Sequence, residues 1–94
     1  MKIVVKKPYK DPYIKEVNGT LEEYQSIVGG YIEVVLFKDD ILLVCNEEGK
    51  LMELEPNLYL RGDIIVGTVF FIGRDKENFR GLTDEEIQEI MNLI

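Results

Sequence analysis

The run IIVGTVFFI at residues 64–72 predicts the longest β-strand of the chain. Two other β-prone runs, at 31–37 and 41–46, flank Lys38-Asp39-Asp40 and predict a hairpin. Weaker runs predict shorter strands at residues 2–6, 13–17 and 51–54, and we expect Pro56-Asn57 to end the last of them.

Two segments carry apolar residues at helical spacing instead, each behind a capping signal. Thr20 and Glu23 have the spacing of a capping box, and Gly29-Gly30 is a typical helix stop. Thr83 and Glu86 repeat the box before the last apolar segment. The predicted order is therefore β-β-α-β-β-β-β-α, an α+β fold with a mostly antiparallel sheet in a single domain over residues 1–94.

The central predicted strands are apolar on both faces. In residues 64–72 both alternating sets are apolar, and the hairpin strands share this property. Two-sided burial requires cover on both faces, which two short helices supply only in part. Either the sheet curls into a partial barrel or a second copy of the chain covers the other face, and we expect a homodimer.

Charge is unevenly distributed along the chain. The net charge is −7, yet residues 1–15 carry +4 and the other 79 residues carry −11. An acidic bulk repels phosphates, so direct nucleic-acid binding is not expected. The basic start of the chain includes an apolar run of only three residues, which predicts neither a signal peptide nor a membrane anchor. A single cysteine fits a reducing, cytoplasmic setting.

Several classes of catalysis lack their side chains. The chain has no histidine, and its only serine, Ser26, falls inside the first predicted helix, so no Ser-His or Cys-His pair and no histidine metal site can form. Paired acids would allow a carboxylate-based magnesium enzyme, but each pair falls at a helix start or a turn. These pairs are Glu22-Glu23, Asp39-Asp40, Glu47-Glu48 and Glu85-Glu86. We expect no catalytic residue, metal or cofactor.

The segment LVCNEEGK, residues 43–50, holds the only thiol beside two acids. Cys45 continues an apolar strand face, which predicts a buried, inert thiol. Asn46 and Gly49 have the spacing of a type I turn, with Gly49 expected in the left-handed conformation that leads into a bulged hairpin. The acids between them then form an exposed tip, a candidate recognition loop.

Polar residues gather in two predicted loop segments. Loops on a rigid sheet are common places for binding groups, although solvated turns explain the same residues. The candidate ligand- or partner-binding residues are Asn46, Glu47, Glu48, Asn57, Tyr59, Arg61 and Asp63.

The central segments resemble a known family. The succession IVGGYIEVV, LVCNEEGKL, PN, GDIIVGTVFFIG and LTDEE is similar to an uncharacterised domain-of-unknown-function family of small proteins carried by bacteriophages and mobile elements. The chain departs from the family's short Leu-Pro-x-Asn segment at residues 54–57. The resemblance implies an accessory protein that works inside a bacterial host, and it implies no activity, cofactor or site residue.

Three functions follow as hypotheses. The first is a non-enzymatic protein that binds a host or phage protein, such as a counter-defence factor, through its acidic surface or a sheet edge. The second is a small homo-oligomer that sequesters a nucleotide or similar metabolite with Tyr31, Tyr59, Asn57 and Arg61. The third is the magnesium enzyme.

Overall fold

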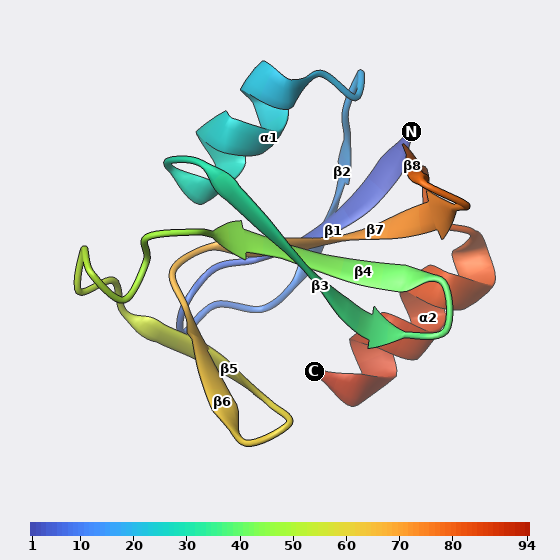
Figure 1. The fold of residues 1–94 in the computed structure, drawn as a ribbon. Coiled ribbons are helices and arrows are strands. Elements are labelled where there is room, and N and C mark those ends of the chain that lie inside the picture. Colours follow the sequence, from blue (N-terminus) through green and yellow to red (C-terminus); the bar gives the residue numbers. More distant parts are fainter.

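Eight strands and two helices make up the computed structural model, which describes all 94 residues (Figure 1). The strands are β1 (Lys2–Lys6), β2 (Tyr13–Glu16), β3 (Ile32–Lys38), β4 (Ile41–Asn46), β5 (Pro56–Leu60), β6 (Asp63–Val66), β7 (Val69–Asp75) and β8 (Asn78–Arg80). The helices are α1 (Leu21–Val28) and α2 (Asp84–Leu93). Neither helix is long and apolar enough to cross a membrane.

The main sheet is antiparallel throughout. Its strands lie in the order β2-β1-β7-β4-β3, and β8 pairs with the end of β7. β5 and β6 form a separate hairpin. The predicted α+β class with a mostly antiparallel sheet is confirmed, but the sheet does not close into a barrel, because its edge strands β2 and β3 do not pair.

Both helices begin as their sequences predict. Thr20 and Thr83 each accept a hydrogen bond from the backbone amide three residues on, and Glu23 and Glu86 close the two capping boxes. Gly29 ends α1 in the left-handed conformation, with φ of 81°. The capping signals therefore locate both helix starts correctly.

Each face of the sheet is covered within the chain (Figure 1). On one face, Tyr24 and Val28 of α1 pack on Phe70 and its neighbours, and the Tyr24 and Phe70 rings stack at 5.3 Å. On the other face, α2 and Ile65 of the hairpin cover a second cluster around Phe71. The two-sided strands thus do not require a second copy, and the homodimer stays a prediction without that support.

The predicted strand at residues 64–72 is in fact two strands in two different sheets. Gly67 lies between them with φ of 77°, a left-handed conformation that strands do not use. The chain turns there from the hairpin into the centre of the main sheet. Apolar residues occur on both sides of Gly67-Thr68, which concealed the break.

Three further predictions about local structure were wrong. Residues 51–54 form turns rather than a strand, closed by the bond from the Leu54 amide to the Gly49 carbonyl at 3.0 Å. Pro56, expected to end a strand, begins β5, a position where the missing N–H is tolerated. The Gly49 amide donates to the Asn46 carbonyl at 3.2 Å and closes the expected turn. Gly49 does not have a positive φ, however, and the turn does not lead into a hairpin. The short strand β8 was not predicted.

Candidate functional site

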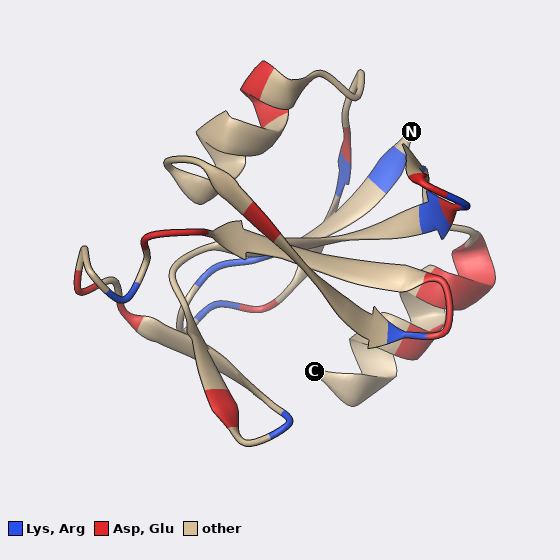
Figure 2. Ribbon diagram, in the orientation of Figure 1, with Lys and Arg blue, Asp and Glu red and all other residues tan.

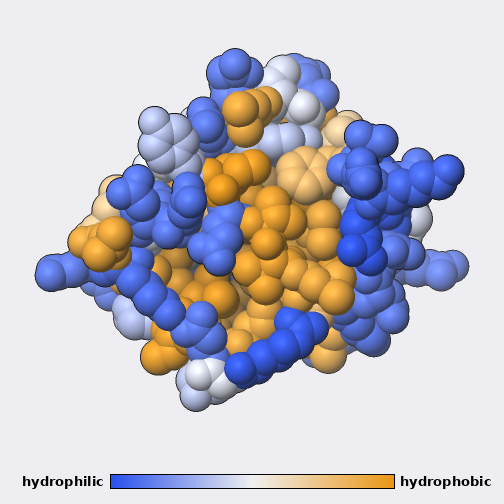
Figure 3. Space-filling model, in the orientation of Figure 1, coloured by the Kyte–Doolittle hydropathy of each residue, from blue (hydrophilic) through white to orange (hydrophobic).

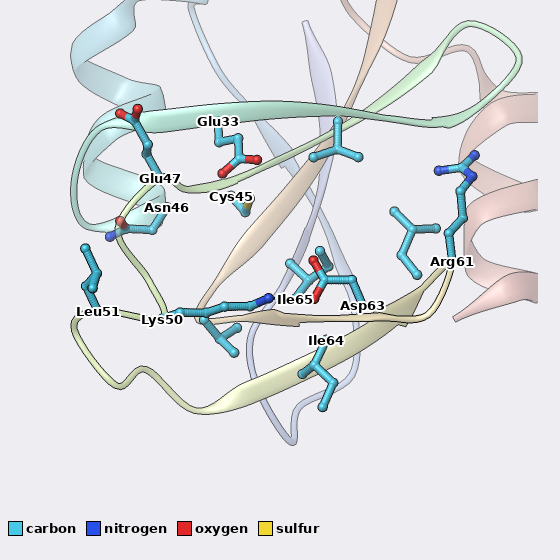
Figure 4. Close-up of a pocket in the computed structure, with 13 residues that line it drawn as sticks. Glu33, Cys45, Asn46, Glu47, Lys50, Leu51, Arg61, Asp63, Ile64 and Ile65 are labelled. Atoms are coloured by element: carbon cyan, nitrogen blue, oxygen red, sulfur yellow. Dashed lines mark hydrogen bonds and ion pairs between the residues drawn. The ribbon is translucent and has the colours of Figure 1, made fainter.

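A cavity of about 410 Å³ lies between β3–β4 of the main sheet and the hairpin β5–β6 (Figure 4). Its floor is apolar because strand alternation points one side chain set of each element inward. The floor residues are Val35, Cys45, Leu60 and Ile65. Charged side chains from β3, β6 and the connecting segments form the rim. The site thus combines an apolar interior with a polar mouth, as small binding sites commonly do.

Arg61 holds the tip of the hairpin to the main sheet. Its guanidinium donates hydrogen bonds to the backbone carbonyls of Leu36 at 2.6 Å and Phe37 at 2.8 Å, both on β3. The Arg61-Gly62 turn makes this possible, since φ values of 49° and 80° produce a tight reversal between β5 and β6. Arg61 therefore closes one end of the cavity.

Asn57 anchors the other end of the hairpin. Its side-chain amide donates to the carbonyls of Lys6 and Gly67, both at 2.8 Å, and its side-chain oxygen accepts from Lys6 Nζ at 3.2 Å. These three hydrogen bonds join β5 to β1 and to the β6–β7 connection. Asn57 is consequently a structural residue and does not line the cavity.

Lys50 and Asp63 form an ion pair across the cavity rim, with Lys50 Nζ 2.5 Å from Asp63 Oδ1. This hydrogen bond lowers the pKa of the Asp63 carboxyl. Both side chains are more than half exposed, so the pair contributes little to stability. Both cationic residues of the rim therefore have partners within the fold, because Lys50 pairs with Asp63 and Arg61 donates to carbonyls of β3.

Glu33 brings an unpaired negative charge to the cavity. It stands directly across from Cys45 in the β3–β4 register, and its carboxylate points toward the cavity in Figure 4. It forms no ion pair, and its side chain forms no hydrogen bond, unlike the carboxylate of Asp63. Figure 2 shows further acidic residues on the segment after β4 and on β6, at the other sides of the cavity. The rim therefore has a surplus of negative charge.

The pKa of the Cys45 thiol is raised by burial and in part by the same negative charges. Burial raises its pKa to about 11, and the negative charges of Glu33 and Asp63 add to the increase. The side chain is buried, as predicted. A thiol with this pKa is protonated near neutral pH and is a poor nucleophile.

β3 presents an open edge beside the cavity. The amide of Glu47 donates to the carbonyl of Tyr31 at 2.8 Å, so these two residues form a hydrogen-bonded pair. Since hydrogen-bonded and non-hydrogen-bonded pairs alternate along an antiparallel ladder, the register places the N–H and C=O groups of Ile32, Val34 and Leu36 on the outer side. No strand lies beside them.

The same edge also exposes apolar side chains on the α1 face of the sheet, beyond the part that α1 covers. Val34 and Leu36 are each 44% exposed. Figure 3 shows apolar side chains gathered in the middle of the molecule over β3 and β4, with hydrophilic side chains on both sides. An exposed apolar strand edge of this kind is a common place for protein association.

The structure brings together four of the seven predicted site residues. Asn46, Glu47, Arg61 and Asp63 line the cavity. Asn46 has a structural role as well, since its side chain donates to the Val28 carbonyl at 3.2 Å and accepts from the Glu48 amide at 2.8 Å.

The remaining predicted residues lie outside the cavity. Glu48 is exposed beside it, and Tyr59 is 73% exposed and is not one of the lining residues. Glu33 and Lys50 were missed. A charged residue inside an apolar strand, as Glu33 is, was the available signal for the first of them. No group of three or more His, Cys, Asp or Glu side chains is placed to hold a metal ion.

Comparison with known proteins finds one family. The family model described as "Domain of unknown function (DUF3846)" matches residues 1–94, which is the whole chain. No curated protein and no solved structure matches.

Proposed function

We propose that this chain, which belongs to the DUF3846 family, is a non-enzymatic domain that binds an extended segment of a partner protein along β3. The observation that carries the proposal is the open edge of β3, with a cavity directly beside it. A segment in this position would add a strand to the main sheet.

Backbone groups would supply the affinity. The outward N–H and C=O groups of Ile32 and Val34 are the ladder positions that an added strand uses. The exposed side chains of Val34 and Leu36 would pack against the apolar side chains of the segment on the α1 face.

The tip of the hairpin lies within reach of one side chain from β3. The Arg61 side chain and its hydrogen bonds bridge from the hairpin to the carbonyls of Leu36 and Phe37. The proposed segment would pair with β3 on this side, next to the hairpin. The segment would replace Arg61 as the partner of the Leu36 carbonyl if it paired along the full length of β3.

The proposed setting comes from the resemblance of the central segments to phage and mobile-element proteins. In that setting the partner is a host or phage protein in the bacterial cytoplasm, and counter-defence is a role that such a binding protein could fill. The chain provides no histidine, and its buried thiol is protonated, which favours binding over catalysis.

Nucleotide sequestration has less support from the geometry. Asn57 is used within the fold and Tyr59 lies on the outer side of the hairpin, so neither joins Arg61 in the cavity. The unpaired acid Glu33 would also repel phosphates. No observation favours the magnesium enzyme.

Proline substitution tests the strand-pairing proposal. Val34→Pro removes an outward N–H of β3 and leaves the ladder to β4 intact. We expect tagged wild-type protein to retain a specific protein from a bacterial host lysate, and Val34→Pro to retain at least about tenfold less, as quantitative mass spectrometry would measure.

The matched control is Ile14→Pro in β2, the other edge strand. Met1 and Val17 donate backbone hydrogen bonds to each other and so form a hydrogen-bonded pair of the β1–β2 ladder. Backbone direction alternates along β2, so Ile14, three positions before Val17, also points its N–H outward. Ile14→Pro should retain the partner. Equal retention by a folded Val34→Pro variant, or failure of the wild type to retain any specific protein, would contradict the proposal.

A further inference from the structure

We infer that the cavity is a subsite for the side chain of a lysine or arginine in the bound segment, with Glu33 as its charge partner. This inference rests on the proposed binding along β3, and it adds the chemistry that the segment must carry.

The position of Glu33 on the edge strand supplies the geometry. Ile32 and Val34 direct their backbone groups toward an added strand, so Glu33 between them takes part in a non-hydrogen-bonded pair with that strand. Side chains come closest together at such pairs, and an oppositely charged residue there is favourable. The residue across from Glu33 projects on the face that carries the cavity, because Glu33 itself lines the cavity.

The charge of the rim selects a cation. Lys50 pairs with Asp63, and Arg61 donates to β3 carbonyls and forms no ion pair with Glu33, so the three lining acids, Glu33, Glu47 and Asp63, outnumber the two lining cations by one. Glu47 contributes a second acid to the lining without an ion pair. An anionic side chain entering the cavity would meet this charge, whereas a cationic side chain would balance it.

The cavity floor suits the alkyl part of the same side chain. Lysine and arginine bury their methylene groups on apolar surfaces while the charged end stays in a polar setting. Val35, Leu60 and Ile65 provide the apolar surface below Glu33. A volume of about 410 Å³ is sufficient for one long side chain.

The test uses small probes that present only the side chain. Acetyl-arginine amide and acetyl-lysine amide are titrated into ¹⁵N-labelled protein, with acetyl-citrulline amide as the neutral isostere of the arginine probe. We expect saturable shifts at the Val35, Cys45 and Ile65 amides with both cations. Binding of the citrulline probe should be weaker by roughly three- to tenfold, since Glu33 is partly solvated.

Two variants locate the effect. Glu33→Gln should reduce the affinity for the arginine probe to that of the citrulline probe. Glu77→Gln is the matched control, since Glu77 is an exposed acid outside the cavity, and it should bind the arginine probe as the wild type does. The spectra of the variants also report whether each one is folded.

The outcomes separate this inference from the proposed function. Equal binding of arginine and citrulline, unchanged binding by Glu33→Gln, or no shift at these amides would overturn the cation subsite and leave strand pairing along β3 standing. Cation-selective shifts together with full partner retention by Val34→Pro would overturn strand pairing, and with it the assignment of the subsite to a partner's side chain.

Discussion

At the scale of single residues, the pair Arg80–Glu86 links the end of β8 to the first turn of α2. The guanidinium donates to both carboxylate oxygens of Glu86, at 2.8 and 2.9 Å. Gly73 of β7 makes this position accessible, because a Cβ there would lie 2.2 Å from Arg80 Nη1. The hydrogen bonds from Arg80 hold the pKa of the Glu86 carboxyl below its ordinary value of 4.5.

Glu86→Gln should destabilise the protein by about 1 kcal/mol near neutral pH, because glutamine keeps the capping box but loses the ion pair. Since the folded-state pKa is lowered, the ionised Glu86 stabilises the fold above its ordinary pKa, and this stabilisation is lost as the pH falls below about 4.5. The difference between variant and wild type should shrink accordingly in urea unfolding at decreasing pH. Glu85→Gln, an exposed neighbour without an ion pair, is the control, and a pH-independent difference would contradict the prediction.

Single residues were predictable where a local rule governs them. Capping boxes and the burial of Cys45 follow from spacing and strand alternation, and both predictions are confirmed. The roles of Asn57 and Arg61 depend on partners in other elements, such as Lys6 for Asn57 and Leu36 for Arg61. No local pattern contains that information, so polar loop residues could be named as candidates but not sorted into structural and exposed ones.

At the scale of elements, Gly67 decides how the hairpin meets the main sheet. Its φ of 77° turns the chain out of β6, and a Cβ there would lie 2.7 Å from Leu54 Cδ1. Sequence periodicity could not reveal this, because apolar residues continue on both sides of it. Element type was therefore predictable for the helices and the β3–β4 hairpin, while the division between β6 and β7 was not.

Gly67→Ala should destabilise the protein by about 2–3 kcal/mol, because the left-handed conformation costs a non-glycine residue roughly 1 kcal/mol and the contact with Leu54 adds to it. Gly62→Ala is the matched control. Gly62 has a φ of 80°, but a Cβ added there would have no atom within 4 Å, so only the backbone cost applies. Equal urea midpoints for the two variants would show that the Leu54 contact carries no cost.

At the scale of the whole molecule, two apolar clusters share one sheet. Adjacent residues of β7 serve opposite clusters, with Phe70 facing α1 and Phe71 facing α2. The sequence showed the two-sided burial, but not that two short helices and a hairpin are enough to cover it. The hairpin supplies the missing cover, and its separate sheet could not be recognised because apolar residues occur on both sides of Gly67-Thr68.

Because the clusters share backbone strands, the protein should unfold in one transition. Val28→Ala and Ile90→Ala truncate buried residues on opposite faces, and we expect losses of about 2 and 3 kcal/mol. Their effects should add in the double variant, since the sheet separates the two sites. Far-UV circular dichroism and tyrosine fluorescence should give coincident urea transitions, whereas separate transitions would mean that the faces unfold independently.

The hydrogen bonds from Arg61 to β3 also bear on how copies of the protein behave toward each other. An open sheet edge can pair with the same edge of another copy and start a growing aggregate. Arg61 covers the acceptors at one end of that edge with a charged group of the same chain, and the acidic side chain of Glu33 repels a second copy farther along. We therefore expect this edge to resist pairing with a second copy while it stays open to the proposed basic segment.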